Sequence, residues 1–385
     1  MKIVIVGTAY PLRGGIAHFN ALLASHLRNT HQVETVTFKR QYPKFLFPGK
    51  SQDEQGTVSE EFGVSPAPQI VDSINPFNWV TAARKIAALK PDLLIFKYWM
   101  PFFGPCFGTI ARLVKRACGS KVLFICDNVI PHERRPGDVA FTKYAFRKSD
   151  YFIVLSNSVE QDLLKYFPQA RYRKVTHPIY EIFGQSVAKT QAREKLGITT
   201  KHVVLFFGYV RKYKGLMVLL DAMKEFYDNA IGSSNKDLAD VTLLVVGEFY
   251  DDESKYREKV KELNIGNIVR FVSDYVPNDQ VGVYFGASDV VVLPYLSATQ
   301  SGIVQIAYNF DRPVIATDVG GLSEVVLNDK TGFIVNPDNS TALSAALKKF
   351  YLEHREEEFR SNIVVEKKKY SWETFIRTIE DLAAE

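Results

Sequence analysis

Residues 297–321 read SATQSGIVQIAYNFDRPVIATDVGG. A small polar loop leads into an apolar helical segment, which is followed by a β-branched strand and the glycine turn Gly320-Gly321. The first N–H groups of a helix have no intrahelical partner, and the helix dipole favours an anion there. Ser301-Gly302 at the helix start therefore predicts a phosphate site. We expect the glycine turn to add a second one, and such a pair suits a diphosphate.

The same alternation of short β-branched runs and longer amphipathic segments extends over the whole chain of 385 residues. Strands are predicted at residues 2–7, 33–38, 93–97, 122–126, 151–155, 174–176, 202–208, 241–247, 268–272, 290–293, 314–317 and 332–335. Helical patterns lie between most of them. The fold class is therefore predicted to be α/β, with two tandem doubly wound Rossmann-like domains whose ligand crevices face a common cleft.

The first domain is predicted to span residues 1–180 and the second residues 181–369, with a link near 177–189. The tail 370–385 is expected to pack back on the first domain, because 371–382 has an amphipathic pattern. Residues 39–75 break the rhythm and are predicted to form a long excursion, since they are rich in Pro, Gly, Gln and charge.

Composition excludes several classes of protein. The chain is 46% hydrophobic and 24% charged, which favours a globular protein over disorder. No apolar run reaches the roughly 18 residues needed to span a bilayer, and the first apolar run is too short for a signal peptide. Cys106, Cys118 and Cys126 lack metal-ligand spacing and favour a reducing compartment. We expect a cytoplasmic protein, with the inner face of the membrane as a second option.

The net charge of +5 hides an asymmetry between the two halves. Residues 1–181 carry 24 Lys and Arg against 14 Asp and Glu, whereas residues 182–385 carry 24 against 29. A basic first half favours an anionic partner such as a lipid headgroup or a lipid-linked phosphate, although a solvated surface without a partner fits equally well. No nucleic-acid recognition motif is present, so nucleic acid is not expected as a partner.

Two loops after predicted strands carry ligand-type residues. Residues 7–15, GTAYPLRGG, lack the G-x-G-x-x-G spacing, which disfavours an NAD enzyme, but Gly14-Gly15 still permits close backbone approach to a ligand. Residues 208–215, GYVRKYKG, carry Arg211 and Lys214. A guanidinium and an ammonium together suit a diphosphate leaving group, on which negative charge grows as its bond breaks.

These motifs resemble those of glycosyltransferase family 4. The similarity is carried by the loop at 208–215, by ASDVVVLPY at 287–295 and by RPVIATDVGGLSEVV at 312–326. It covers residues 200–340 well and is weaker in the first domain. The resemblance implies the GT-B fold and a hexosyltransferase of polysaccharide biosynthesis. Such an enzyme moves a sugar from a nucleotide-diphosphate donor to a glycan or lipid-linked acceptor, with retention and without a metal or other cofactor.

The resemblance also implies roles by position. Arg211 and Lys214 match the cations that hold the donor diphosphate, and they are the first two predicted catalytic residues. Asp127 and His132 are the other two, because one of them stands near the family's histidine in the first domain. The predicted donor-binding residues are Gly14, Gly15, Gly208, Gly247, Glu248, Tyr275, Val276, Thr299, Gln300, Ser301, Gly302 and Gln305.

The chain departs from the family at two positions. The family's two glutamates, eight positions apart, correspond to Ala298 and Ile306. A covalent double displacement needs a carboxylate at the anomeric carbon, so we expect instead a same-face attack that relies on positioning and charge stabilisation. Gln300 and Gln305 could replace some hydrogen bonds but cannot act as a base or nucleophile.

Other interpretations stay open at this stage. Both missing glutamates also fit a non-catalytic relative that binds nucleotide sugar or glycan, and a GT-B sugar-nucleotide epimerase is a third option. The aromatic run at 97–103, KYWMPFF, is either a wall for the acceptor or part of the core. The cluster HERR at 132–135 fits an acceptor phosphate or a surface ion cluster.

Overall fold

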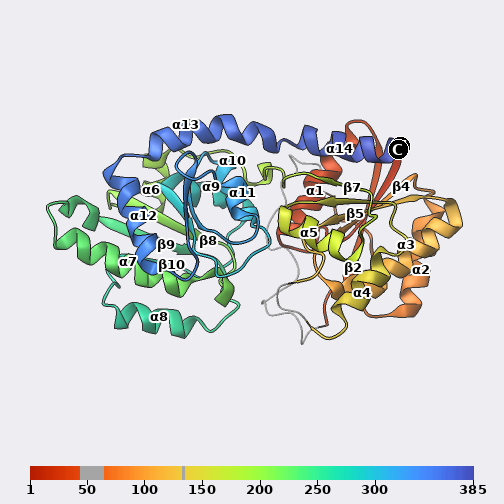
Figure 1. Cartoon of the computed structure of the whole chain (residues 1–385), viewed down its shortest axis with the longest axis horizontal. Coiled ribbons are helices and arrows are strands. Elements are labelled where there is room, and N and C mark those ends of the chain that lie inside the picture. Colours follow the sequence, from red (N-terminus) through yellow and green to blue (C-terminus); the bar gives the residue numbers. More distant parts are fainter. Residues whose placement is uncertain (44–64, 132–134) are drawn as a thin grey trace. The chain divides into compact units, whose positions relative to one another are not determined.

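The computed structural model describes residues 1–43, 65–131 and 135–385 (Figure 1). The chain divides into two compact units. The first unit comprises Met1–Ile182 and Tyr370–Glu385, and the second comprises Phe183–Lys369. The predicted boundary at residue 180 lies two residues before the observed one.

The first unit is built on a seven-stranded parallel sheet, counted over the described residues, with strand order β3-β2-β1-β4-β5-β6-β7. Its strands are β1 Lys2–Val6, β2 Gln32–Arg40, β3 Gln69–Asp72, β4 Leu93–Tyr98, β5 Lys121–Cys126, β6 Tyr151–Val154 and β7 Tyr172–Lys174. The central strands are buried on both faces, which explains their continuous apolar runs. The order reverses direction between β1 and β4, as in a doubly wound fold.

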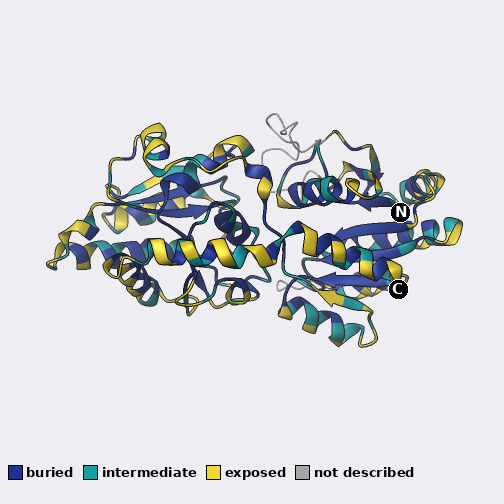
Figure 2. Ribbon diagram, turned by 90° about the horizontal axis from the view of Figure 1, so that it is seen from above, coloured by how far each residue is buried: buried dark blue, intermediate teal, exposed yellow. Residues whose placement is uncertain are grey.

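Helices cover this sheet and connect its strands (Figure 2). They are α1 Gly15–Arg28, α2 Pro76–Ala88, α3 Gly104–Cys118, α4 Asp138–Phe146, α5 Asn157–Tyr166 and α14 Trp372–Ala384. The tail helix α14 packs on α1. There, Trp372 donates from Nε1 to the Ile179 carbonyl at 2.9 Å and stacks on His26 at 5.1 Å between ring centroids.

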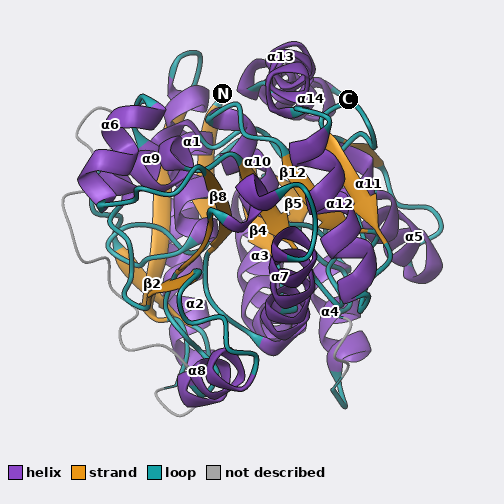
Figure 3. Cartoon of the chain, turned by 90° about the vertical axis from the view of Figure 1, so that its left-hand side faces the viewer, coloured by secondary structure: helices purple, strands orange, loops and turns teal. Residues whose placement is uncertain are grey.

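The second unit repeats the plan with a six-stranded parallel sheet among the described residues, in the order β10-β9-β8-β11-β12-β13. Its strands are β8 His202–Phe207, β9 Val241–Val246, β10 Val269–Val272, β11 Val290–Leu293, β12 Val314–Thr317 and β13 Gly332–Val335. Its helices are α6 Lys189–Leu196, α7 Leu216–Ile231, α8 Glu253–Glu262, α9 Asn278–Ala287, α10 Gly302–Asn309, α11 Leu322–Val325, α12 Ser340–Leu352 and α13 Glu356–Glu366 (Figure 3). The predicted class, two Rossmann-like α/β domains, is confirmed.

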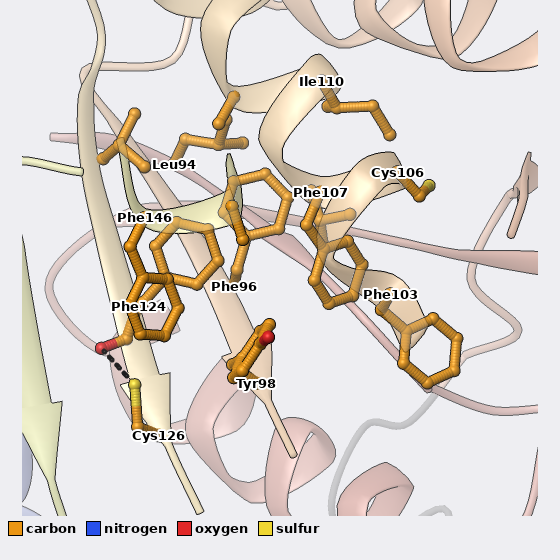
Figure 4. Packing of buried hydrophobic residues seen from close by; sticks show 14 of the residues in the cluster. Leu94, Phe96, Tyr98, Phe103, Cys106, Phe107, Ile110, Phe124, Cys126 and Phe146 are labelled. Carbon is orange, nitrogen blue, oxygen red and sulfur yellow. Dashed lines mark hydrogen bonds between the residues drawn. The ribbon is translucent and has the colours of Figure 1, made fainter. Parts of the chain in front are cut away.

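The aromatic run at 97–103 belongs mainly to the core of the first unit. Tyr98 and Phe103 are fully buried. The neighbouring Phe96 ring stacks on the Phe124 ring, with 4.9 Å between their centroids, and its centroid lies 5.1 Å from that of Phe107 (Figure 4). Fully burying such a ring contributes about 1.5–3 kcal/mol. Of the two interpretations, the structure therefore favours packing for most of this segment.

One strand lies inside the segment that the sequence predicts as an excursion. Among the described residues, β3 pairs only with β2, at the edge of the sheet, with an irregular register. It is four residues long and preceded by Pro66 and Pro68, so it has neither the length nor the continuous apolar pattern of the central strands. Local sequence gives little signal for such an edge strand.

Candidate functional site

The candidate site lies in the second unit, where the strand order reverses between β8 and β11. In open α/β sheets, ligands bind outside the carboxyl ends of the strands at such a switch point. The loop after β8 spans residues 208–215, and the loop after β11 leads to the start of α10. Both carry residues that the sequence predicts as donor-binding.

Two glycines allow the loop after β8 to lie close to the loop after β11. Gly208 and Gly215 have φ values of 99° and 69°, a region that favours glycine. A Cβ at Gly215 would collide with the Pro294 carbonyl. The Leu296 N–H also donates to the Tyr213 carbonyl at 2.7 Å. The two loops are therefore joined by direct backbone contact.

Lys214 is held inside this arrangement. Its side chain is buried, and its Nζ lies 5.6 Å from the centroid of the Tyr295 ring. Burial, and to a smaller extent the charge of Arg211, lower the pKa of the Lys214 ammonium to about 7. A buried cation at a switch point is an electrostatic arrangement suited to an anionic ligand.

Arg211 lies at the exposed side of the same loop. Its guanidinium lies 5.2 Å from the centroid of the Tyr250 ring, which in turn packs 4.5 Å from the Tyr209 ring. The Val210 N–H donates to the Glu248 carbonyl at 2.9 Å, and this bond joins the loop after β8 to the loop after β9. The predicted residues Arg211 and Lys214 thus share one loop but differ in exposure.

The start of α10 faces the same pair of loops. Ser301 is the N-cap, and its Oγ accepts from the Ile303 N–H at 3.2 Å. The Tyr295 hydroxyl lies 3.1 Å from the same Oγ. Tyr295 therefore touches the helix start through its hydroxyl while its ring lies near the Lys214 ammonium. Tyr295 was not among the predicted site residues, and only its place after a buried strand, in the motif LPY, could have indicated it.

The glycine turn Gly320-Gly321 does not have the role expected from the sequence. Its Gly321 N–H donates to the Thr299 carbonyl at 2.8 Å, and a Cβ at Gly320, whose φ is 54°, would collide with the Ala298 carbonyl. The turn therefore supports the loop before α10 from behind. The expectation of a second phosphate site at this turn was wrong for the Gly321 N–H, which is already engaged.

The remaining predicted donor-binding residues of this unit lie around the same sheet edge, with different exposure. Gly247 has φ of 141° and approaches the Gly208 carbonyl closely. Glu248, Val276 and Gln305 are buried. Tyr275, Thr299, Gln300 and Gly302 are half-buried.

Two of the buried positions bear on the missing glutamates. Ala298 and Ile306 are 8% and 5% exposed, so both are packed apolar positions. The Oε1 atom of the nearby Gln305 is buried and has no hydrogen-bond partner among the described residues. No carboxylate replaces the family's glutamates at these two positions.

In the first unit, the predicted residues lie at the carboxyl edge of the sheet. Asp127 directly follows β5, and its Oδ1 lies 2.7 Å from the Nζ of Lys97 in β4. Lys97 was not predicted as a site residue; a lysine inside the apolar strand LLIFKY is the signal that could have identified it. Burial raises the pKa of the Asp127 carboxyl, and the Lys97 charge opposes that shift.

Helix α1 contacts this ion pair through Phe19, whose ring centroid lies 3.5 Å from the Lys97 Nζ. Gly14 has φ of 109°, and Gly15 is exposed. The Gly15 carbonyl accepts from the Tyr180 hydroxyl at 3.1 Å. His132 lies outside the described residues. No group of three His, Cys, Asp or Glu side chains that could hold a metal occurs in the described part of the chain.

Part of the chain matches a known protein family. Residues 201–353 match the family model described as glycosyl transferases group 1. The match covers residues 201–353 of the 385-residue chain, within the second unit.

A curated relative is similar to part of the chain. Over 166 residues the chain is 30% identical to the D-inositol 3-phosphate glycosyltransferase of Corynebacterium glutamicum, covering 43% of this chain and 38% of that protein. The chain thus spans about two fifths of that relative's length.

Two solved structures share the fold over nearly the whole chain. The sucrose-phosphate synthase of Thermosynechococcus elongatus has a TM-score of 0.75 at 18% identity, with 99% of this chain and 98% of that chain covered. Anabaena HepE, solved in complex with UDP, has a TM-score of 0.77 at 16% identity, with full coverage of both chains. These neighbours are GT-B glycosyltransferases, which agrees with the expected fold.

Proposed function

We propose that this protein is a retaining glycosyltransferase that moves a hexose from a nucleotide-diphosphate sugar to a glycan or lipid-linked sugar, without a metal or other cofactor. The observation that carries the proposal is the chain of contacts from Lys214 through Tyr295 to Ser301. It links a buried cation to a helix start at the switch point of the second sheet. Both features favour a diphosphate. HepE, a structural neighbour, binds UDP and UDP-glucose, which supports UDP as the first probe.

The proposed chemistry uses charge stabilisation. As the bond between the anomeric carbon and the diphosphate oxygen breaks, negative charge grows on the leaving group, and Lys214, Arg211 and the N–H groups at Ser301-Gly302 stabilise it. The acceptor oxygen bonds to the anomeric carbon on the same face. Its proton passes to the departing phosphate oxygen, so the products are the glycoside and the nucleoside diphosphate.

This route fits the apolar positions Ala298 and Ile306. A double displacement would need a carboxylate near the anomeric carbon, and at these positions none is present. In the first unit, we propose that Asp127 accepts a hydrogen bond from a sugar hydroxyl, with Gly14 and Gly15 allowing close backbone approach. This part of the proposal is tested separately, with Asp127→Asn.

The test begins with binding. A panel of UDP-, GDP- and ADP-sugars is screened by thermal shift, because a ligand of the native state raises the melting temperature. Nucleoside diphosphate release is then measured with and without candidate glycan and lipid-linked acceptors. We expect Arg211→Ala and Lys214→Ala each to lower the transfer rate at least about tenfold, within the range for lost transition-state contacts.

Lys212→Ala is the matched control, since Lys212 is an exposed cation of the same loop. The proposal fails if Arg211→Ala and Lys214→Ala leave the rate unchanged, or if Lys212→Ala lowers it equally. The loss of both family glutamates favours one alternative, a non-catalytic nucleotide-sugar-binding relative. Binding of a nucleotide sugar without transfer or slow hydrolysis would establish that alternative.

A further inference from the structure

One helical layer of the first unit has an unusual charge distribution. α2 packs on α3 and α3 packs on α4 (Figure 1). All three contribute buried residues to a single core cluster with the sheet. Their sequences contain one acidic residue, Asp138, which is buried and accepts from the Arg135 N–H at 2.8 Å. The outward surface of the three helices therefore presents cations without carboxylates of its own.

The cations of this layer are mostly unpaired. Lys115 forms an ion pair with Asp150 at 2.5 Å. Across the parts of the chain that the structure describes, no ion pair joins Arg84, Lys85 or Arg116 to a carboxylate. All three are exposed. In the second unit, by contrast, exposed lysines and arginines are often paired within their own helix or with a neighbour, as Arg257 is with Glu253. The positive potential of the layer is therefore little compensated locally.

Exposed apolar side chains stand on the same layer. Phe77 in the first turn of α2 is 86% exposed, and Phe141 in α4 is 43% exposed. Val80, one turn after Phe77, is also exposed. Because α2 and α4 each follow a parallel strand, both begin at the carboxyl edge of the sheet, so Phe77 and Phe141 lie toward the same edge. Phe77 and Val80 are neighbours on one face of α2, so they form a small exposed apolar patch of the kind that can mark an interaction surface.

We propose that the outer face of α2, α3 and α4 binds the surface of an anionic phospholipid bilayer. Lipid headgroups supply a dense array of negative charge for Arg84, Lys85 and Arg116, and the boundary of the acyl chains accepts Phe77. Neither property alone selects a bilayer, but cations and exposed apolar rings on one layer fit it better than they fit nucleic acid, which offers phosphates without an apolar layer. This inference is independent of the proposed transfer activity.

The test measures co-sedimentation of the full chain with vesicles. Mixed phosphatidylglycerol–phosphatidylcholine vesicles are compared with pure phosphatidylcholine vesicles. We expect binding to the anionic vesicles only, and we expect it to fall when salt is raised from about 0.1 M to 1 M, because the Debye length shrinks from about 10 Å to 3 Å. Sedimentation that is equal for both vesicle types, or absent from both, overturns the proposal.

Substitutions in α2 test whether this surface is the one that binds the vesicles. Arg84→Glu with Lys85→Glu should weaken partitioning by more than about tenfold, since each basic residue near an anionic surface strengthens binding roughly fivefold. Phe77→Ser should weaken it severalfold while leaving the melting temperature unchanged, because the ring is exposed. The matched control, Lys255→Glu with Lys348→Glu, makes the same charge change at exposed positions of the second unit.

The outcomes separate a bilayer from a different partner and from bulk charge. Loss with the α2 variants and retention in the control support the proposal. An equal loss in the control overturns it, because the total charge of the protein would then account for the binding. Binding of duplex DNA through Arg84 and Lys85 without vesicle binding also overturns it, in favour of a nucleic-acid partner. Transfer assays are not needed for any of these outcomes.

Discussion

The Lys97 ammonium lies 2.7 Å from the Asp127 carboxylate and 3.5 Å from the centroid of the Phe19 ring. The Lys97 side chain is 1% exposed, whereas the Asp127 side chain is 23% exposed. The ion pair stands where β4 and β5 end, and Phe19, which the Lys97 ammonium contacts, belongs to α1. Burial lowers the pKa of Lys97, and the Asp127 charge opposes that shift. Each group therefore stabilises the charged form of the other.

Replacing Lys97 should show how far the stability of the fold depends on the pairing of Lys97 with Asp127. Lys97→Met is expected to lower the free energy of unfolding by about 3 kcal/mol, the low end of the range for breaking a buried pair, because Asp127 retains some solvent contact. The measurement is urea denaturation. The matched control is Lys115→Met, which removes a lysine from the half-exposed pair with Asp150 and should cost less than about 1 kcal/mol.

The pH dependence supplies a second readout for Lys97→Met. Without the Lys97 charge, the pKa of Asp127, already raised by burial, rises further. A carboxyl whose pKa is higher in the native state than in the unfolded state destabilises the fold as pH increases through that interval. The deficit of the variant should therefore be smaller at pH 5 than at pH 8. Equal costs for Lys97→Met and Lys115→Met would contradict the proposed coupling.

Lys214 leads to a prediction about UDP binding. Its pKa of about 7 in the ligand-free protein means that the ammonium loses its proton as pH rises above 7. A diphosphate favours the protonated form, so binding takes up a proton. UDP affinity should fall between pH 7 and pH 9, by up to about tenfold per pH unit. Calorimetry in buffers of different ionisation enthalpy measures the proton uptake directly.

Two variants separate Lys214 from Arg211 in this experiment. Lys214→Met should weaken UDP binding at pH 7 and remove the pH dependence. Arg211→Ala should also weaken binding but keep a pH dependence, with its onset moved to higher pH, because the Arg211 charge lowers the pKa of Lys214. If Lys214→Met retained the wild-type slope, the titrating group would be a different one.

Ser301 links the same site to helix stability. Ser301→Ala removes the N-cap hydrogen bond to the Ile303 N–H and the contact with the Tyr295 hydroxyl. We expect a loss of about 1 kcal/mol of unfolding free energy together with weaker UDP binding. Ser371→Ala is the control, since Ser371 caps α14 by accepting from the Thr374 N–H. It should cost similar stability and leave UDP binding unchanged.

The sequence predicted the parts of the fold that rest on regular patterns. Central strands such as β8 and β11 are continuous apolar runs, and their places follow from composition and spacing alone. β3 was missed because an edge strand of four residues lacks that pattern. Helix α13 was missed as well, because its buried face consists of only Phe359 and Ile363, which is too few residues for a clear amphipathic pattern.

The candidate site was predictable to a smaller degree. Arg211, Lys214 and Ser301 stand in loops after predicted strands, so their residue types and positions were sufficient to select them. Tyr295 and Lys97 were not selected, because their importance depends on contacts between separate strands. The role of Gly321 was also misjudged, since no local pattern shows that its N–H donates to the Thr299 carbonyl.

The support that the glycine turn gives to the loop before α10 leads to the last prediction. Gly320 has φ of 54°, and any side chain there would press on the carbonyls of Ala298 and Thr299. Gly320→Ala should therefore displace the loop that carries Ser301 and weaken UDP binding. The expected stability loss exceeds the roughly 1 kcal/mol that the left-handed conformation alone costs a residue with a Cβ.

Gly197→Ala isolates the conformational cost from the collision. Gly197 also has positive φ, 60°, but a Cβ there meets no atom within 4 Å. It should lose about 1 kcal/mol and bind UDP as the wild type does. Denaturation curves and UDP titrations of both variants give the comparison. If Gly320→Ala bound UDP normally despite its larger stability loss, the loop at Ser301 would not depend on this turn, and the assignment of a supporting role to Gly320 would be wrong.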